Sequence, residues 1–309
     1  MTSLVLPDYR LREMEDMQAI LMLAHTNFDW VKCLAEKLAK SFEVYIHFDK
    51  RYHLKQGQYE ELNKQCIHCF QKEKVMWGGY SITAATIYLM KEILKDPRIS
   101  YVHIISGQDW PAIPVKEIFD FYENEDRIFM LSSRADGCIK SGQNILNWQC
   151  FYYNFDVIPR RNVFGRIYHR VIYKIQQILG VDKLKKYVPG LEIYQGPNWM
   201  DLPRYALEYL LEYWDRNEGL RMVFKTGFCP DEFWVQTILE NSPYKEKIER
   251  NYHRYILWEQ KNGSYPAVLD RTDLERVKQG DYHFIRKVIP VYSQELINGL
   301  DSSDTCSKI

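Results

Sequence analysis

The sequence has no excess of either charge sign and no long apolar run. Lys plus Arg and Asp plus Glu each number 41, so the formal net charge is zero. A dedicated nucleic-acid binder depends on basic groups that neutralise phosphates, so we expect no nucleic-acid partner. The apolar run at 19–24 is too short to span a bilayer, and residues 1–12 are mixed and polar, unlike a signal peptide. Both absences favour a cytoplasmic protein.

The cysteines lack a pattern that would indicate a disulfide framework or a metal site. They number seven and are scattered along the chain, which fits reduced thiols in a cytosol. Cys66 and Cys69 have C-x-x-C spacing, but no second ligand pair follows at zinc-finger distance, so a metal or redox role there has little support.

Internal repeats and low-complexity linkers are missing too. A chain of 309 residues without them can bury a large core as one unit. We expect a single domain at 18–290, preceded by an N-terminal extension at 1–17 and followed by a C-terminal tail at 291–309, whose last residues look frayed.

The first clear pattern is a β-α-β unit. The run at 19–24 is typical of a strand buried on both faces, and an amphipathic helix at about 29–41 separates it from a second strand at 43–48. Such a unit predicts a parallel pair with a right-handed crossover. Ligands in open α/β sheets bind beyond the carboxyl ends of strands, where His25 and Asp49 lie. Asp49 could accept hydrogen bonds from a nucleoside or serve only as a cap in a solvated turn.

Further strands and helices alternate along the chain and predict an α/β fold. Gly78 and Gly79 could allow close backbone approach to a ligand or simply form a turn. Ser81 suits the N-cap of the next helix. Asp109 lies in a polar loop at the end of a buried strand. The predicted elements of this part are helices at 82–94 and 115–122 and strands at 101–105 and 127–131. Farther along the chain, Asp201 is expected to cap a helix at 202–215.

Two adjacent carboxylates, Asp231 and Glu232, follow Pro230 and open an apolar run. Proline suits the start of a helix, and anions are favoured there by the helix dipole. The pair could therefore serve only to complement that dipole. Alternatively, Glu232 could be a general base, with Asp231 beside it pushing one of the two pKa values upward.

Basic and apolar residues interleave from 160 to 186, which predicts an amphipathic helix. This pattern suits a helix that docks onto anionic lipid, but a core-facing helix with a solvated basic face explains it equally well. The basic residues are Arg160, Arg161, Arg166, His169, Arg170, Lys174, Lys183, Lys185 and Lys186, and the apolar ones are Val163, Phe164, Ile167, Val171, Ile175, Ile178 and Leu179.

In their order and spacing, several segments resemble the core-2/I-branching family of glycosyltransferases, which includes β-1,6-N-acetylglucosaminyltransferases and peptide-O-xylosyltransferases. The resemblance covers about 18–290 and implies a GT-A-like α/β fold with a mixed, Rossmann-like sheet flanked by helices. It implies a nucleotide-binding half at about 18–132 and an acceptor and catalytic half at about 133–290. The segments that carry it are His47-Phe48-Asp49, 101–111, 194–204, Cys229-Pro230-Asp231-Glu232, 254–258 and 284–287.

The resemblance also implies roles for single residues. Glu232 corresponds to the family's catalytic base, and Lys287 to a lysine that binds the donor diphosphate, with Arg271 as the second cation. His25 and Asp49 would hold the nucleoside. Trp258, Asp109 and Asp231 are expected on the substrate side, near the acceptor. The transmembrane anchor and stem of animal members are missing here, which indicates a bacterial relative.

The chemistry implied is inverting sugar transfer without a divalent metal. Many nucleotide-sugar enzymes hold a metal with an Asp-x-Asp motif, and this chain has none. Fixed cations must then compensate the charge of the leaving diphosphate, which Lys287 and Arg271 would do. We therefore expect no metal cofactor and a UDP-sugar donor, with UDP-GlcNAc as the leading candidate, and a β-linkage.

Other interpretations stay open. UDP-xylose is an alternative donor, because no residue here determines the choice of sugar. A non-catalytic nucleotide- or sugar-binding protein on the same fold is a second alternative, although an intact Glu232 argues against it. The expected acceptor is a glycan or a lipid-linked saccharide, with peripheral contact between the 160–186 helix and the inner face of the cytoplasmic membrane.

Overall fold

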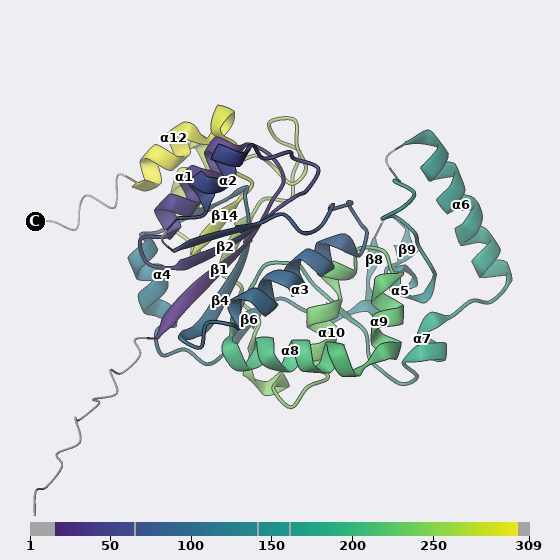
Figure 1. Cartoon of the computed structure of the whole chain (residues 1–309). Helices are drawn as coiled ribbons and strands as arrows, with labels where there is room; N and C mark the ends of the chain where they lie inside the picture. The colour runs from purple at the N-terminus through teal and green to yellow at the C-terminus, as the bar shows by residue number, and fades with distance from the viewer. Residues whose placement is uncertain (1–15, 65, 141, 161, 302–309) are drawn as a thin grey trace, which may run out of the picture.

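The computed structural model describes residues 16–64, 66–140, 142–160 and 162–301. Its centre is a seven-stranded mixed sheet in the order β12-β6-β11-β4-β1-β2-β3 (Figure 1). Strand β11 runs antiparallel to both of its neighbours, and the other pairs are parallel. The predicted α/β class with a mixed sheet flanked by helices is confirmed. The strands are β1 Met17–Ala24, β2 Glu43–Phe48, β3 Ile67–Phe70, β4 Ile99–Ser106, β6 Ile128–Met130, β11 Met200–Pro203 and β12 Ile248–Glu249.

The β-α-β unit forms as the pattern predicts. Strand β1 lies between β2 and β4, so Leu21 is paired with Tyr45 on one side and Ile104 on the other. Every residue of β2 is buried, and this includes the polar Glu43 and His47 as well as the apolar residues between them. The crossover helix α1 spans Phe28–Leu38, shorter than the predicted 29–41, and Asn27 caps its first turn.

Helices cover both faces of the sheet and create two hydrophobic cores. One core packs α1, α4 (Val115–Tyr122), α11 (Leu274–Lys278) and α12 (Pro290–Asp301) against the sheet. The other packs α3 (Ser81–Ile93), α8 (Arg204–Arg216), α9 (Glu218–Lys225) and α10 (Trp234–Glu240) against the opposite face. Ser81 begins α3 instead of capping it, and Asp156 accepts hydrogen bonds from the Tyr80 and Ser81 amides.

Two expectations about the chain's organisation change. Helix α12 buries Leu296, Ile297 and Leu300, so the predicted C-terminal tail at 291–309 contains a packed helix as far as Asp301. Asp201, expected to cap a helix at 202–215, instead lies buried in β11. Residues 1–15 of the predicted N-terminal extension, Arg161 and 302–309 lie outside the described residues.

Asp201 is the centre of a buried polar network that joins residues far apart in the chain. Its carboxylate accepts hydrogen bonds from Arg254 at 2.6 and 3.0 Å and from Tyr122 at 2.8 Å, and His103 Nδ1 lies at 2.9 Å. Burial opposes its ionisation, but Arg254 and His103 hold the pKa of Asp201 well below its ordinary value. A buried pair of this kind leaves an uncompensated charge when one partner is removed.

A small sheet, β13-β14-β5, adjoins the main one. Its strands are β5 Asp109–Pro111, β13 Arg254–Ile256 and β14 Phe284–Arg286. The antiparallel pairing of β14 with β5 sets Arg286 opposite Asp109. Two residues that are 177 positions apart in the sequence therefore lie opposite each other.

The predicted basic helix at 160–186 is broken into two. Helix α6 spans Val163–Ile178, Gly180 has φ +63°, and α7 follows at Lys183–Tyr187. Lys183 is buried, where its ammonium donates to the carbonyl of Val223 and to the Thr226 hydroxyl, both at 2.9 Å, so it is not part of a solvated basic face. Helix α6 stands at the far end of the molecule from α12 (Figure 1).

The remaining elements are short. They are α2 Gln56–Leu62, α5 Asn147–Cys150, the strand pairs β7 Ser133–Arg134 with β10 Tyr194–Gln195 and β8 Ile139–Lys140 with β9 Gln143–Asn144, and 3-10 turns at Ala135–Gly137, Pro230–Glu232, Lys245–Lys247 and Arg271–Asp273. Within the described residues, no helix combines the length and apolar composition needed to cross a bilayer. The cysteines described there are free thiols.

Candidate active site

The turn that carries Glu232 is held from two sides. Cys229 adopts a left-handed conformation, Pro230–Glu232 forms a 3-10 turn, and α10 begins only at Trp234, later than the sequence predicts. The Cys229 amide donates to the carbonyl of Gly78 at 2.9 Å, and the Gly196 amide donates to the carbonyl of Glu232 at 2.9 Å. Two glycine-containing loops far away in the sequence thus fix this turn.

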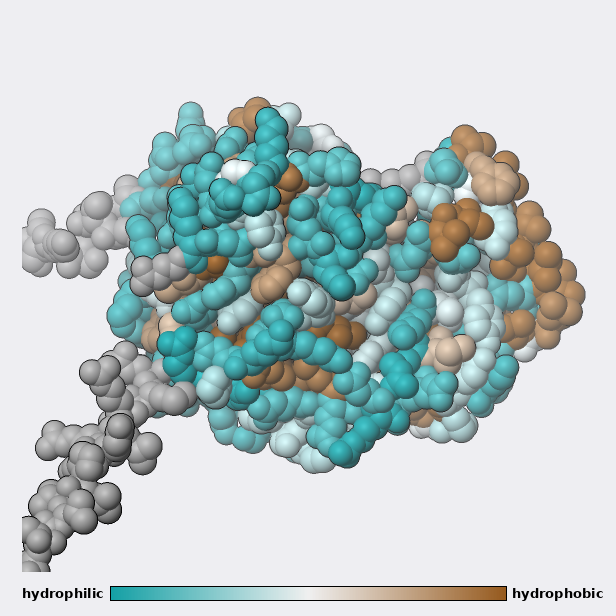
Figure 2. Space-filling model, viewed as in Figure 1, coloured by the Kyte–Doolittle hydropathy of each residue, from teal (hydrophilic) through white to brown (hydrophobic). Residues whose placement is uncertain are grey.

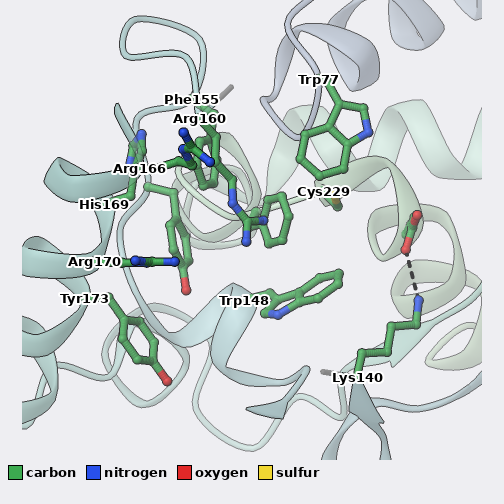
Figure 3. A pocket seen from close by; sticks show the side chains of 13 residues that line it. Trp77, Lys140, Trp148, Phe155, Arg160, Arg166, His169, Arg170, Tyr173 and Cys229 are labelled. Carbon is green, nitrogen blue, oxygen red and sulfur yellow. Dashed lines mark hydrogen bonds and ion pairs between the residues drawn. The ribbon is translucent and has the colours of Figure 1, made fainter. Parts of the chain in front are cut away.

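The Glu232 side chain lines a pocket of about 520 Å³. Its Oε2 lies 3.4 Å from Nζ of Lys140, and the carboxylate side chain is 33% exposed (Figure 3). Aromatic and basic side chains make up most of the wall. The lining residues are Trp77, Lys140, Trp148, Tyr153, Phe155, Arg160, Arg166, His169, Arg170, Tyr173, Phe228, Cys229 and Glu232.

Asp231 lies in the protein interior and is not among the residues that line this pocket. Its Oδ1 has no hydrogen-bond partner within the described residues. Burial, together with the neighbouring Glu232 carboxylate, raises the pKa of Asp231 to about 8. The raised pKa favours the protonated form of Asp231, and Glu232 is the carboxylate that forms the ion pair with Lys140.

His25 and Asp49 lie at the carboxyl ends of β1 and β2, as predicted. Asp49 is buried and accepts hydrogen bonds from the Arg51 guanidinium at 2.6 and 3.0 Å and from the Arg51 amide at 2.9 Å. Burial alone would raise the pKa of Asp49, but these bonds hold it below its ordinary value. The carboxylate thereby positions Arg51, whose side chain is 45% exposed.

Two adjacent cations, Arg286 and Lys287, lie close to the β1 and β2 ends. Burial and the charge of Arg286 lower the pKa of His25, and Lys287 also contributes to this shift, so these groups share one electrostatic neighbourhood. Burial and Arg286 likewise lower the pKa of Lys287, whose Nζ donates to Ser264 at 3.2 Å. The result is a cationic group at the sheet edge.

Asp109 holds the Arg286 side chain of this cationic group in place. It is buried and accepts hydrogen bonds from Arg286 at 2.8 Å and from the Trp199 indole at 3.0 Å, and the Arg286 guanidinium lies 4.4 Å from the centre of the Trp199 ring. Asp109 therefore positions Arg286 rather than facing the pocket of Glu232. Sequence reasoning missed Arg286, although its position directly before Lys287 was a usable signal.

Two other predicted residues have no side-chain hydrogen bond or ion pair to these groups within the described residues. Arg271 begins a 3-10 turn with an exposed side chain, and no hydrogen bond or ion pair in the described part of the chain joins it to Lys287. Trp258 is 54% exposed, has Tyr265 as its aromatic neighbour at 5.9 Å, and does not line the Glu232 pocket.

The segment at 75–78 connects the cationic group with the Glu232 pocket. The Val75 amide donates to Asp49 at 3.3 Å, and the Arg51 guanidinium lies 3.8 Å from the Met76 sulfur. Trp77 lines the pocket, and Gly78 has φ +76°. A Cβ on Gly78 would come within 2.6 Å of the Phe228 ring, so the glycine forms a turn that also allows close packing. The two groups are thus neighbours through one short loop.

The basic lining of the pocket was not assigned from the sequence. Lys140 and Arg160 come from the region at 133–165, and Arg166 and Arg170 come from α6. Arg160 lies 5.0 Å from the Phe228 ring centre and 6.0 Å from that of Trp77. The run of basic residues before and within α6 was the signal that could have indicated a charged pocket wall.

Comparison with known proteins identifies the family. A family model described as Core-2/I-Branching enzyme matches residues 21–283. The chain belongs to this family. The prediction of an enzyme of the core-2/I-branching glycosyltransferase family is confirmed. The matched region includes Asp49, Asp109 and Glu232 and ends before Arg286 and Lys287.

Curated relatives are distant and much longer. The chain is 25% identical to mouse xylosyltransferase 1 over 295 residues, covering 85% of this chain and 28% of that protein. It is 25% identical to bovine xylosyltransferase 2 over 285 residues, covering 85% and 30%. The chain thus spans under a third of the length of these relatives. A solved structure titled WbbM bifunctional glycosyltransferase is 9% identical with a TM-score of 0.41, covering 96% of this chain and 50% of that one.

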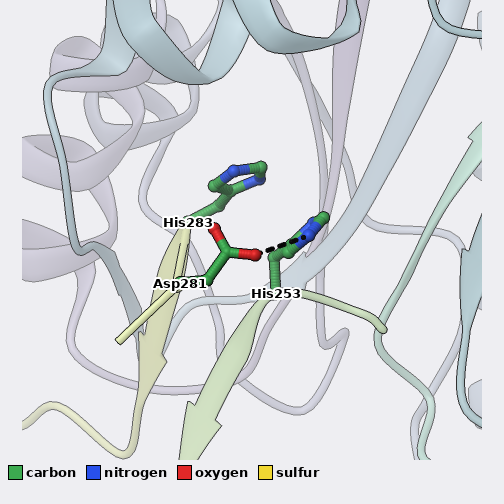
Figure 4. Close-up of side chains that lie close together, drawn as sticks. All are labelled: His253, Asp281 and His283. Atoms are coloured by element: carbon green, nitrogen blue, oxygen red, sulfur yellow. Dashed lines mark ion pairs between the residues drawn. The ribbon is translucent and has the colours of Figure 1, made fainter. Parts of the chain in front are cut away.

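A separate cluster of His253, Asp281 and His283 brings three possible ligand atoms within 4.8 Å of one another (Figure 4). His253 Nε2 lies 3.3 Å from Asp281, and both histidine Nδ1 atoms lie within 3.2 Å of the Tyr122 hydroxyl. Burial lowers the pKa of His283 to about 3. His253 and His283 directly precede β13 and β14, whereas Lys287 directly follows β14. The cluster therefore lies at the opposite end of these two strands from Lys287.

Proposed function

We propose that this protein is a metal-independent, inverting glycosyltransferase that moves a sugar from a UDP-sugar to a glycan or lipid-linked saccharide. The observation that carries the proposal is the position of Glu232, which lines an aromatic pocket next to Lys140 and is connected through the loop at 75–78 to a cationic group. A carboxylate beside an acceptor pocket and fixed cations beside a donor position are the two parts that such a transfer needs.

The reaction follows from these parts. The acceptor hydroxyl attacks the anomeric carbon of the donor, and Glu232 takes the hydroxyl proton. A new C–O bond forms while the bond between the anomeric carbon and the diphosphate oxygen breaks, and UDP leaves with the bonding electrons. Lys287 and Arg286 would compensate the charge on the diphosphate, with Arg271 as a further candidate from the sequence. Attack opposite the leaving group inverts the anomeric configuration and yields a β-linkage from an α-linked donor.

The leading donor candidate is UDP-GlcNAc, with His25, Asp49 and Arg51 near the nucleoside. A second candidate, UDP-xylose, is favoured by the names of the curated relatives, which are xylosyltransferases. For the acceptor, Asp109, Asp231 and Trp258 were the sequence-based candidates. The aromatic and basic residues that line the Glu232 pocket are better-supported candidates for binding the acceptor. The protein would work in the cytoplasm, in peripheral contact with the inner face of the membrane.

The test is a thermal-shift series with UDP, UDP-GlcNAc, UDP-xylose, UDP-glucose and UDP-galactose, each with EDTA and with added Mn²⁺. A ligand that binds the folded state raises its melting temperature by mass action. Stabilisation that EDTA leaves unchanged is the expected result, and the most stabilising sugar names the donor. A shift that required Mn²⁺ would refute the metal-independent site. UDP binding with no consumption of any UDP-sugar would favour a non-catalytic binding protein.

A further inference from the structure

Helix α6 presents its apolar side chains to solvent. Phe164 is 69% exposed and Ile178 84% exposed, although helices on a protein surface normally turn such residues toward the core. Figure 2 shows the apolar residues gathered over the outer side of α6. The exposed apolar residues are Val163, Phe164, Ile167, Val171, Ile175 and Ile178, with Leu179 directly after the helix. A contiguous apolar surface of this size marks an interaction site.

The orientation of α6 is fixed by polar contacts on its opposite side. His169 hydrogen-bonds the carbonyl of Ile158 at 2.8 Å, and the Gln176 amide bonds both backbone groups of Tyr152, at 2.7 and 3.0 Å. Gly165 allows close packing, because a Cβ there would lie 2.0 Å from the carbonyl oxygen of Pro159. The buried residues of the helix are therefore Gly165, His169 and Gln176, and none of its large apolar side chains is among them.

A row of cations runs along one edge of the apolar face. Arg166, Arg170 and Lys174 follow one another at four-residue intervals, so they lie on one line along the helix. Helix α6 contains no acidic residue, and none of these three cations has an ion-pair partner in the part of the chain that the structure describes. Arg166 and Arg170 also line the pocket of Glu232 (Figure 3).

We infer that α6 docks this enzyme onto an anionic lipid bilayer, with its apolar face in the interfacial region and its cations against lipid phosphates. Exposed apolar side chains bordered by basic ones are what an interfacial helix presents to such a surface. A second copy of the chain docked through the same helix fits less well, because α6 contains no acidic residue that could pair with these cations. An anionic bilayer provides both an apolar region for the exposed side chains and phosphates for the cations.

Docking through α6 determines which acceptors reach Glu232. The same helix contacts the bilayer and forms a wall of the pocket, so the pocket opens beside the lipid phosphates. The substrate class is then a saccharide carried on a membrane lipid through a phosphate, with Arg166 and Arg170 near that phosphate and Trp148 and Tyr173 in the same pocket. This inference deepens the proposed function and rests on it for the role of Glu232, whereas the docking itself does not.

The experiment is sedimentation of the full chain with sucrose-loaded vesicles. We expect binding to POPC with 30% POPG at low salt, weaker binding at high salt, and little binding to POPC alone. Phe164→Ser combined with Ile167→Ser and Ile178→Ser removes exposed apolar groups and should weaken binding at least ~10-fold. Arg166→Gln with Arg170→Gln should also weaken it ~10-fold or more. Val291→Ser and Lys278→Gln, exposed residues on α12 and α11, are the matched controls.

Several outcomes would overturn the inference. They are a wild-type protein that ignores POPG vesicles at low salt, controls that lose binding as strongly as the α6 variants, and a dimer by light scattering that the triple apolar variant converts to monomer. The UDP thermal shift of each variant separates this inference from the proposed function. Lost vesicle binding with an intact UDP shift concerns α6 alone, whereas an absent UDP shift in a wild type that binds vesicles contradicts only the proposed transferase.

Discussion

Lys140 Nζ lies 3.4 Å from Glu232 Oε2, although the two residues are 92 positions apart in the chain. The hairpin of β8 and β9 thus brings a cation to the carboxylate that we propose as the base. Both side chains are partly exposed, so solvent weakens the attraction, and its main effect is on the direction of the carboxylate. The same pocket wall carries the α6 arginines, so base and basic surface form one site.

Replacing the proposed base should abolish most turnover without weakening the binding of the donor nucleotide. Glu232→Gln keeps the size of the side chain but cannot accept the acceptor proton, so we expect turnover to fall by at least ~10²-fold. The measurement is UDP release with the donor selected by thermal shift, and the UDP thermal shift itself should be retained. Turnover equal to that of the wild type would remove Glu232 from this role.

Lys140→Gln should have a modest effect that depends on Glu232. The ion pair is partly exposed, so its loss should reduce turnover by no more than about fivefold. In the Glu232→Gln background the same substitution should change nothing further, because the partner charge is already gone. A double-mutant cycle on turnover measures this coupling. Independent, multiplicative effects would mean that Lys140 acts on something other than Glu232.

The donor cations can be separated by single substitutions. Lys287→Gln and Arg286→Gln should each weaken UDP binding ~10-fold or more, since each would remove the charge-assisted hydrogen bond that we propose to the diphosphate. Arg271→Gln should have a smaller effect, because its side chain is exposed and no hydrogen bond or ion pair among the described residues joins it to Lys287. Calorimetric titration with UDP gives the affinities, and the melting temperature without ligand controls for the loss of the Arg286–Asp109 pair. The reverse order would restore Arg271 as the second diphosphate cation.

The pH dependence of the free energy of unfolding should include a contribution from Asp231. Its pKa is about 8 in the folded protein, against ~3.9 in an unfolded chain, so the unfolded state releases this proton first as the pH rises. The carboxyl therefore destabilises the fold progressively from about pH 4 to about pH 8. Asp231→Asn removes this cost, so its free energy of unfolding relative to the wild type should improve by up to ~1.4 kcal/mol per pH unit over that range.

Urea unfolding at pH 5, 6, 7 and 8 measures the trend for Asp231. Asp29→Asn, at an exposed position in α1, is the control and should leave the difference from the wild type nearly constant. A difference for Asp231→Asn that did not change with pH would show that this carboxyl is ionised in the folded protein throughout the range.

The sequence by itself determined the local elements and their order. A continuous apolar run predicts β1 and a mostly apolar one predicts β2, because both faces of these strands are buried, and helical periodicity predicts α4 with its correct bounds. The carboxyl ends of β1 and β2 follow directly from the β-α-β unit, so His25 and Asp49 could be located at the sheet edge without coordinates. The family resemblance also depends only on residue order, and the family model confirms it.

The tertiary structure alone decided which side of each element faces what. The apolar periodicity of α6 is compatible with a core-facing helix, and only the contacts of His169 and Gln176 turn that face to solvent. The sequence predicts a helix cap at Asp201, but in the fold this residue forms a buried ion pair with Arg254. Arg286 gains a role only through the pairing of β14 with β5, which sets it opposite Asp109. A local pattern specifies a stripe along a helix or strand. What covers that stripe is decided by residues far away in the chain, through burial and charge pairing that no local window contains.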